Sequence, residues 1–95
     1  KGVSPYDVLI APLMTKDGLA EKAKEISNML LESGIDVFYD ESGSIGKRYA
    51  RADEIGIFHS ITIDYESLEN NTVTVRERDS TKQKRMLVTS LKDLF

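Results

Sequence analysis

The stretch Asp40–Gly56 reads DESGSIGKRYARADEIG, and it indicates how the surrounding chain folds. It follows a short apolar run, crosses a turn rich in Ser and Gly, and continues with apolar residues at helical spacing. Ser42 or Ser44 can cap this helix, because a short hydroxyl accepts hydrogen bonds from the free amides of a first turn. Gly56 is expected to end it, since glycine readily adopts the left-handed conformation that follows many helices. The stretch therefore predicts a strand, a turn and a helix in succession.

Three basic residues lie within the first part of this helix: Lys47, Arg48 and Arg51. A helix start offers free N–H groups and the positive end of a dipole, and nearby cations add to its attraction for phosphate. We therefore predict that all three side chains contact the phosphate backbone of a nucleic acid.

Apolar runs and turn signals on either side predict the remaining elements. Strands are predicted at residues 6–13, 35–40, 58–65, 72–78 and 82–87, and helices at 19–31, 45–55 and from 91 onward. The first two strands and their helix form a βαβ unit with parallel strands, whereas the last two strands should pair antiparallel. The predicted fold is a three-layer α/β domain with a mixed five-stranded sheet flanked by about three helices.

Local signals set the expected ends of the first helix and of the fourth strand. Thr15 or Asp17 is a plausible N-cap for the first helix, and Gly34 would end it in a left-handed conformation. Residues 66–71 are polar and finish in Asn-Asn, which indicates a turn.

Composition limits the class of protein. The chain has 95 residues, 40% hydrophobic and 31% charged, which suits one soluble globular domain over residues 1–95. No apolar run approaches the ~20 residues that a membrane span needs, so no membrane partner is expected. The absence of Cys excludes disulfides and thiolate metal sites and favours a cytoplasmic location. Because the chain begins with Lys1 rather than Met, we expect a piece of a longer protein.

The net charge of −3 hides an uneven distribution of charge. Residues 1–41 carry 4 basic and 8 acidic groups, whereas residues 73–87 carry 5 basic and 2 acidic groups. Phosphate responds to local potential within a screening length of ~10 Å, so the second region suits a nucleic acid. The alternative is a charged strand that is simply solvated.

Patterns that would indicate an enzyme are weak. His59 is the only histidine, and strand alternation places Ser60 and Asp64 on the face opposite it, so a Ser-His-Asp triad is disfavoured. Residues 43–47 superficially resemble a P-loop, but the first Gly and the final Ser or Thr of that motif are missing. Asp53 and Glu54 point about 100° apart on a helix, so they should be solvated or pair with arginines of the same helix.

The sequence also resembles a known family. Residues 40–56 and the block NTVTVRERDS at 71–80 look like the anticodon-binding domain of archaeal and eukaryotic-type glycyl-tRNA synthetase, a class II enzyme. With the KDG segment at 16–18, the similarity extends over nearly the whole chain. One departure is that Ile57-Phe58 stands where this family usually has Thr-Pro, which concerns the local turn.

The resemblance implies a function for the domain and for its parent. The domain would bind the anticodon stem-loop of glycine tRNA, and a separate catalytic domain of the same parent chain would use ATP with magnesium to ligate glycine. No cofactor is expected in the domain itself, and the parent would be a cytoplasmic homodimer.

The resemblance also suggests which residues read the anticodon. Glycine anticodons end in two cytosines, and cytosine calls for a carboxylate to accept from N4 and an Arg to donate to O2 or N3. Similar class II domains have a Glu before the fourth strand and an Arg-x-Arg pair on it, which Glu69, Arg76 and Arg78 match. Asp79 is the second candidate carboxylate.

Two other functions stay open at this point. The same fold occurs in a mitochondrial DNA polymerase accessory subunit, so the chain could be a non-catalytic interaction module. That module need not keep the RERD sequence at 76–79. A small flavodoxin-like enzyme or nucleotide binder is disfavoured by the missing phosphate loop.

Overall fold

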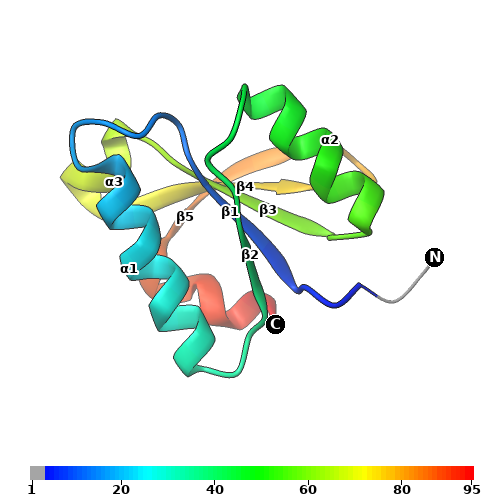
Figure 1. Cartoon of the computed structure of the whole chain (residues 1–95). Coiled ribbons are helices and arrows are strands. Elements are labelled where there is room, and N and C mark those ends of the chain that lie inside the picture. The colour runs from blue at the N-terminus through cyan, green and yellow to red at the C-terminus, as the bar shows by residue number, and fades with distance from the viewer. Residues whose placement is uncertain (1–3) are drawn as a thin grey trace.

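The computed structural model describes residues 4–95 and contains a five-stranded sheet in the order β2-β1-β3-β4-β5 (Figure 1). The strands are β1 (Val8–Pro12), β2 (Val37–Tyr39), β3 (His59–Ile63), β4 (Thr72–Glu77) and β5 (Gln83–Leu87). β1 pairs in parallel with β2 and β3, and β4 pairs antiparallel with β3 and β5. The predicted mixed sheet is confirmed.

The helices are α1 (Leu19–Glu32), α2 (Ile45–Ile55), α3 (Tyr65–Asn70) and a 3₁₀ helix, η1 (Val88–Leu94). α1 and α2 lie where they were predicted. The prediction of a turn over 66–71 is wrong, because this segment forms α3. Asp64 accepts a hydrogen bond from the Ser67 N–H, and the Ser67 hydroxyl accepts one from the Asp64 N–H, which together stabilise a short polar helix.

The predicted side-chain cap of α1 is also wrong. Gly18 occupies the N-cap position with φ of 84°, and no side chain caps the helix. The Asp17 carboxylate instead accepts a hydrogen bond of 2.7 Å from the Tyr65 hydroxyl. Gly34, with φ of 85°, follows the helix in the left-handed conformation as expected.

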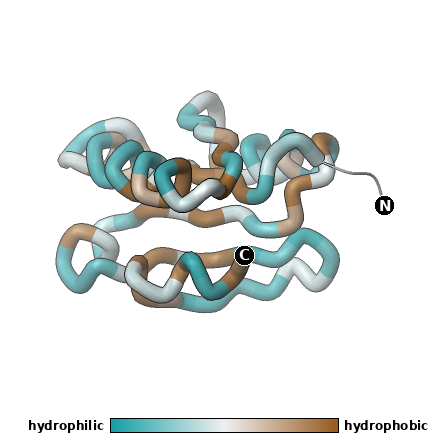
Figure 2. Tube along the Cα trace, turned by 90° about the horizontal axis from the view of Figure 1, so that it is seen from below, coloured by the Kyte–Doolittle hydropathy of each residue, from teal (hydrophilic) through white to brown (hydrophobic). Residues whose placement is uncertain are grey.

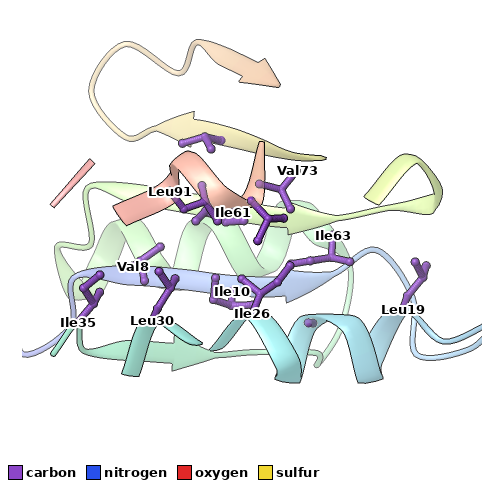
Figure 3. Packing of buried hydrophobic residues seen from close by; sticks show 13 residues of the cluster. Val8, Ile10, Leu19, Ile26, Leu30, Ile35, Ile61, Ile63, Val73 and Leu91 are labelled. Atoms are coloured by element: carbon purple, nitrogen blue, oxygen red, sulfur yellow. The ribbon is translucent and has the colours of Figure 1, made fainter. Parts of the chain in front are cut away.

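The larger core lies between the sheet and α1 (Figure 3). Alternate residues of β1, β3 and β4 point toward this side, because successive strand residues face opposite ways. The cluster comprises Val8, Ile10, Leu19, Ala23, Ile26, Leu30, Ile35, Ile61, Ile63, Val73, Val75, Val88 and Leu91. η1 closes it through Val88 and Leu91.

A smaller core lies on the opposite side of the sheet, under α2. It comprises Leu9, Ala11, Ala52 and Ile57, with Ile45 and Tyr49 partly buried against it. Helices on both faces make the three layers, and the hydrophobic residues gather along the interior of the molecule while the outer coils are hydrophilic (Figures 1 and 2).

Candidate nucleic-acid interface

Helix α2 begins and ends as its sequence predicts. The Ser44 hydroxyl accepts a hydrogen bond of 3.3 Å from the Lys47 N–H, and the preceding strand β2 leads directly into this turn. Gly56 has φ of 93°, a conformation that glycine adopts without strain, and its N–H closes the last turn. The basic first half of α2 therefore lies beside the carboxyl ends of β1 and β2.

Arg48 does not take the position predicted for it. Its side chain is buried, with 4% of the residue exposed, and points into the protein. Its Nε and Nη2 donate to the Gly43 carbonyl at 3.1 and 2.8 Å, and its Nη1 donates to the Pro12 carbonyl. In this conformation Arg48 cannot reach a phosphate, because its guanidinium is already enclosed by main chain.

Lys47 and Arg51 remain at the surface to different degrees. Lys47 is exposed, and in the described part of the chain its ammonium has no ion pair. Arg51 is partly exposed and donates through Nε to the carboxylate of Asp40 at 2.8 Å and through Nη2 to the Ser42 carbonyl. Lys47 is therefore the more accessible cation, whereas Arg51 is already hydrogen-bonded to the loop before α2.

Arg76 extends from β4 beneath α2. Its guanidinium carbon lies 4.7 Å from the centre of the Tyr49 ring, which is the distance of a cation–π contact. Two of its nitrogens face the two carboxylate oxygens of Asp53 at 3.3 and 3.4 Å. Asp53 was expected to be solvated or to pair within its own helix, and it pairs across to the sheet instead. With 12% of its side chain exposed, Arg76 links α2 to β4.

Arg78 and Asp79 lie together at the far end of β4. Arg78 Nε donates to the Asp79 carboxylate at 2.9 Å, and 20% and 62% of these side chains are exposed. Arg78 also lies near Gly56, at the end of α2, so Arg76 and Arg78 share the α2 side of the sheet as predicted.

Glu69 lies apart from this pair. It is exposed on α3, before β4 begins, whereas Arg78 follows the last residue of β4. The six residues of β4 separate them by roughly 20 Å at ~3.4 Å per strand residue. Glu69 and Arg78 therefore do not come together on one base in this conformation, and Asp79 is the carboxylate beside Arg78.

A groove of about 250 Å³ opens between α2 and the last two strands. Its lining combines apolar and polar side chains: Leu13, Ile45, Tyr49, Thr62, Asp64, Thr74 and Gln83. The Tyr49 hydroxyl and the Thr62 hydroxyl are 2.7 Å apart, which joins α2 to β3 at the base of the groove. Ligand sites usually combine apolar walls with a few placed polar groups. This groove is more polar than that, because four of its seven lining residues are Thr, Asp or Gln.

Arg85 borders this groove, and sequence reasoning missed it. Its guanidinium donates to the carboxylate of Asp64 and, at 2.8 and 3.2 Å, to the hydroxyls of Thr72 and Thr74. Arg85 stands directly opposite Thr74 in the antiparallel pair, so register alone would have placed both on one face. Asp64 was missed as a cap because its partner is Ser67 rather than the usual Glu or Gln.

His59, Ser60 and Asp64, which were considered as a triad, do not converge. His59 packs edge-on against the rings of Phe58 and Phe95, and burial lowers its pKa, with Lys84 lowering it further and Glu77 opposing. Ser60 is buried on the other side of β3. Within residues 4–95 no group of three metal-ligating side chains comes together, and none of the helices there is long and apolar enough to cross a bilayer.

Comparison with known families identifies the family to which this chain belongs. A family model described as "Anticodon binding domain" matches residues 7–95. The chain belongs to this family. The resemblance seen in the sequence is thereby confirmed, and the basic helix and the β4–β5 surface are parts of an anticodon-binding domain.

Named relatives of this anticodon-binding domain are ligases. It is 48% identical over 91 residues to the glycine–tRNA ligase of Methanocaldococcus jannaschii and 53% identical over 89 residues to that of Treponema denticola. These matches cover 96% and 94% of this chain but 16% and 20% of the relatives. The chain thus spans less than a quarter of the length of the curated relatives it matches.

Solved structures confirm the fold of the anticodon-binding domain. Prolyl-tRNA synthetase from Cryptosporidium parvum, complexed with L-proline and AMP, matches with a TM-score of 0.84 at 19% identity, over 95% of this chain and 20% of that one. Histidyl-tRNA synthetase from Nostoc sp. PCC 7120 matches with a TM-score of 0.83 at 20% identity, over 96% of this chain and 22% of that one.

Proposed function

We propose that this chain is the anticodon-binding domain of a glycine–tRNA ligase and that it holds the anticodon stem-loop of glycine tRNA. The observation that carries the proposal is the identity of 48% and 53%, over nearly the whole chain, to proteins of that name. The domain takes in residues 1–95. The rest of the parent supplies the catalytic domain, which uses ATP with magnesium to attach glycine, and the parent is a cytoplasmic homodimer.

Phosphate contacts are assigned to the exposed side of α2. Lys47 is the accessible cation there, and Arg51 adds charge beside it while it stays bonded to Asp40. Such contacts position a nucleic acid but do not read its sequence.

Base reading is assigned to the α2 side of β4 and β5. Arg78 and Asp79 present donors and an acceptor side by side, as the edge of a cytosine requires. Uracil would offer an oxygen in place of the N4 amino group, and that oxygen would face the carboxylate. Arg76 supports this surface from beneath α2, and Glu69 flanks it at the other end of β4.

The groove beside α2 suits a second unstacked base. Single-stranded RNA is recognised through splayed bases that stack on aromatic or guanidinium planes and meet polar groups at their edges. Tyr49 supplies a ring, and Thr74 and Gln83 supply polar groups in the same groove.

A binding titration tests the proposal. The chain is titrated with glycine tRNA, with the same tRNA carrying uracil in place of the two anticodon cytosines, and with a tRNA for another amino acid. Tighter binding of unaltered glycine tRNA than of both others is expected. Equal affinity for all three would contradict anticodon recognition by this domain.

A further inference from the structure

Arg48 is an unusual residue for the interior of a protein. It is the only basic side chain among the buried polar residues of the described chain. A buried charge is unfavourable unless it is well paired and hydrogen-bonded. The three hydrogen bonds of its guanidinium end on main-chain carbonyls rather than on a carboxylate, so the side chain holds main chain in place.

The two carbonyls that Arg48 binds come from segments far apart in sequence. Pro12 ends β1 and is followed by Leu13, which lines the groove. Gly43, with φ of 76°, belongs to the loop between β2 and α2. Arg48 therefore ties the end of one strand, the loop and its own helix into one unit.

A second arginine holds the other half of the same loop. Arg51 donates to the Ser42 carbonyl and to the buried carboxylate of Asp40, and that carboxylate also accepts from the Ser42 N–H at 2.9 Å. Two consecutive carbonyls of the loop are thus held by arginines of α2, Ser42 by Arg51 and Gly43 by Arg48. Lys47 and the groove residues Ile45 and Tyr49 follow directly after it in the chain.

We propose that Arg48 is a positioning residue for anticodon recognition: it holds the β2–α2 loop and the end of β1, and so keeps the α2 wall of the groove and Lys47 in place relative to β4 and β5. This inference rests on the proposed function. A wall that is held in place before binding avoids the entropy loss of ordering it when RNA arrives. Arginine suits the task better than lysine, because its planar fork reaches two carbonyls at once.

The test uses two variants of Arg48: Arg48→Lys keeps the charge but not the planar fork, and Arg48→Met removes both. Lys47→Met is the control matched to Arg48→Met at the neighbouring exposed position. Thermal unfolding of all three variants is measured first, and Arg48→Lys alone carries the comparison of affinity and discrimination if Arg48→Met does not fold. Affinity for the glycine anticodon stem-loop is then measured over a range of salt, well below the unfolding temperature.

For Arg48→Lys we expect affinity to fall by about tenfold in the folded protein, with an unchanged salt dependence and weaker discrimination between cytosine and uracil anticodons. Lys47→Met should instead reduce the slope of log K against log salt by about 0.7–0.9. A slope reduced in Arg48→Met as it is in Lys47→Met would show a direct phosphate contact and overturn the inference.

Unchanged affinity and discrimination in a folded but less stable Arg48→Lys would show a purely structural role, which also overturns it. If the unaltered chain itself does not discriminate between these RNAs, the proposed function fails. If the unaltered chain discriminates and Arg48→Lys discriminates equally well, only the inference fails.

Discussion

The two faces of the sheet differ in what they bury. The face toward α1 is covered by a cluster of 13 buried apolar residues, which come from three strands, two helices and, in the case of Ile35, the loop before β2. The face toward α2 carries four, and beside them lie buried Ser60 and Thr62 and the partly exposed Arg76. Apolar burial is the main source of folding free energy, so most of it comes from the α1 face.

This difference indicates a division of labour within one small domain. Under the proposed function, the α1 face can be closed and apolar because it only has to hold the fold together. The α2 face keeps polar and charged side chains at the groove and along β4 and β5, where a base or a phosphate can meet them. Substitutions on the first face should change unfolding, and substitutions on the second should change binding.

The largest expected effect compares two neighbouring residues of β3. Ile61 is fully buried on the α1 face, and replacing it with Ala should reduce the free energy of unfolding by about 2–5 kcal/mol, through lost burial and a cavity. Thr62 lies on the α2 face and bonds to Tyr49, so Thr62→Val should have a smaller effect on unfolding. Chemical denaturation measures both, and equal losses would contradict the contrast between the faces.

The next effect concerns binding. Arg78→Ala should weaken the affinity for glycine tRNA by about 1–3 kcal/mol and leave a non-cognate tRNA nearly unaffected, because a base contact is lost. Unfolding should hardly change, since Arg78 is partly exposed and pairs with its neighbour Asp79. Calorimetric titration of both tRNAs checks this. Equal losses for a cytosine anticodon and its uracil variant would limit Arg78 to backbone contact.

Asp64 lies where the two faces meet, since it caps α3 and pairs with Arg85 beside the groove. Asp64→Ala should reduce the free energy of unfolding by about 0.5–2 kcal/mol, because the cap is lost. Asp64→Asn is the matched control, because asparagine can still cap but carries no charge for Arg85. Thermal unfolding of both variants separates cap from ion pair, and a similar loss in Asp64→Asn would show that the charge dominates.

The smallest effect is a pH dependence of stability. Burial lowers the pKa of His59 below its usual value of 6.5, so the folded protein binds this proton less readily than the unfolded chain does. The contribution of neutral His59 to the free energy of unfolding is therefore fully present above pH 6.5. It is lost as the pH falls from there toward the pKa of His59 in the folded protein. The stability advantage of the unaltered protein over His59→Gln should shrink between about pH 7.5 and pH 5.5. A stability advantage that grows as the pH falls would contradict a lowered pKa for His59.

Strands and long helices could be predicted from the sequence because burial sets their patterns. The run around β1 is continuous and apolar, the run around β3 is rich in β-branched and aromatic residues, and α1 shows a clear helical period, so tertiary packing and local preference agree there. Helix α3 escaped prediction because its six residues include a single aliphatic side chain and so show no apolar period, and its start is set by the reciprocal bonds between Asp64 and Ser67.

Strand alternation predicted part of the arrangement of the candidate residues, but the sequence did not predict the partners of their long side chains. The sequence placed Arg76 and Arg78 on one face, which strand alternation requires. It could not show that Arg48 turns inward, because helical spacing gives a direction around the axis but not the partner that a long side chain finds. Nor could it show that Arg85 reaches Asp64, because that contact depends on the pairing of β4 with β5.

The most direct test of the central claim, that RNA binds on the α2 face, is to follow backbone amide signals by NMR while the chain is titrated with the glycine anticodon stem-loop. We predict that the shifts that change most belong to residues around Lys47, Tyr49 and Gln83, and that those of the exposed α1 residues Lys24 and Asn28 stay unchanged. Changes concentrated along α1, with α2 and β5 unaffected, would contradict the claim.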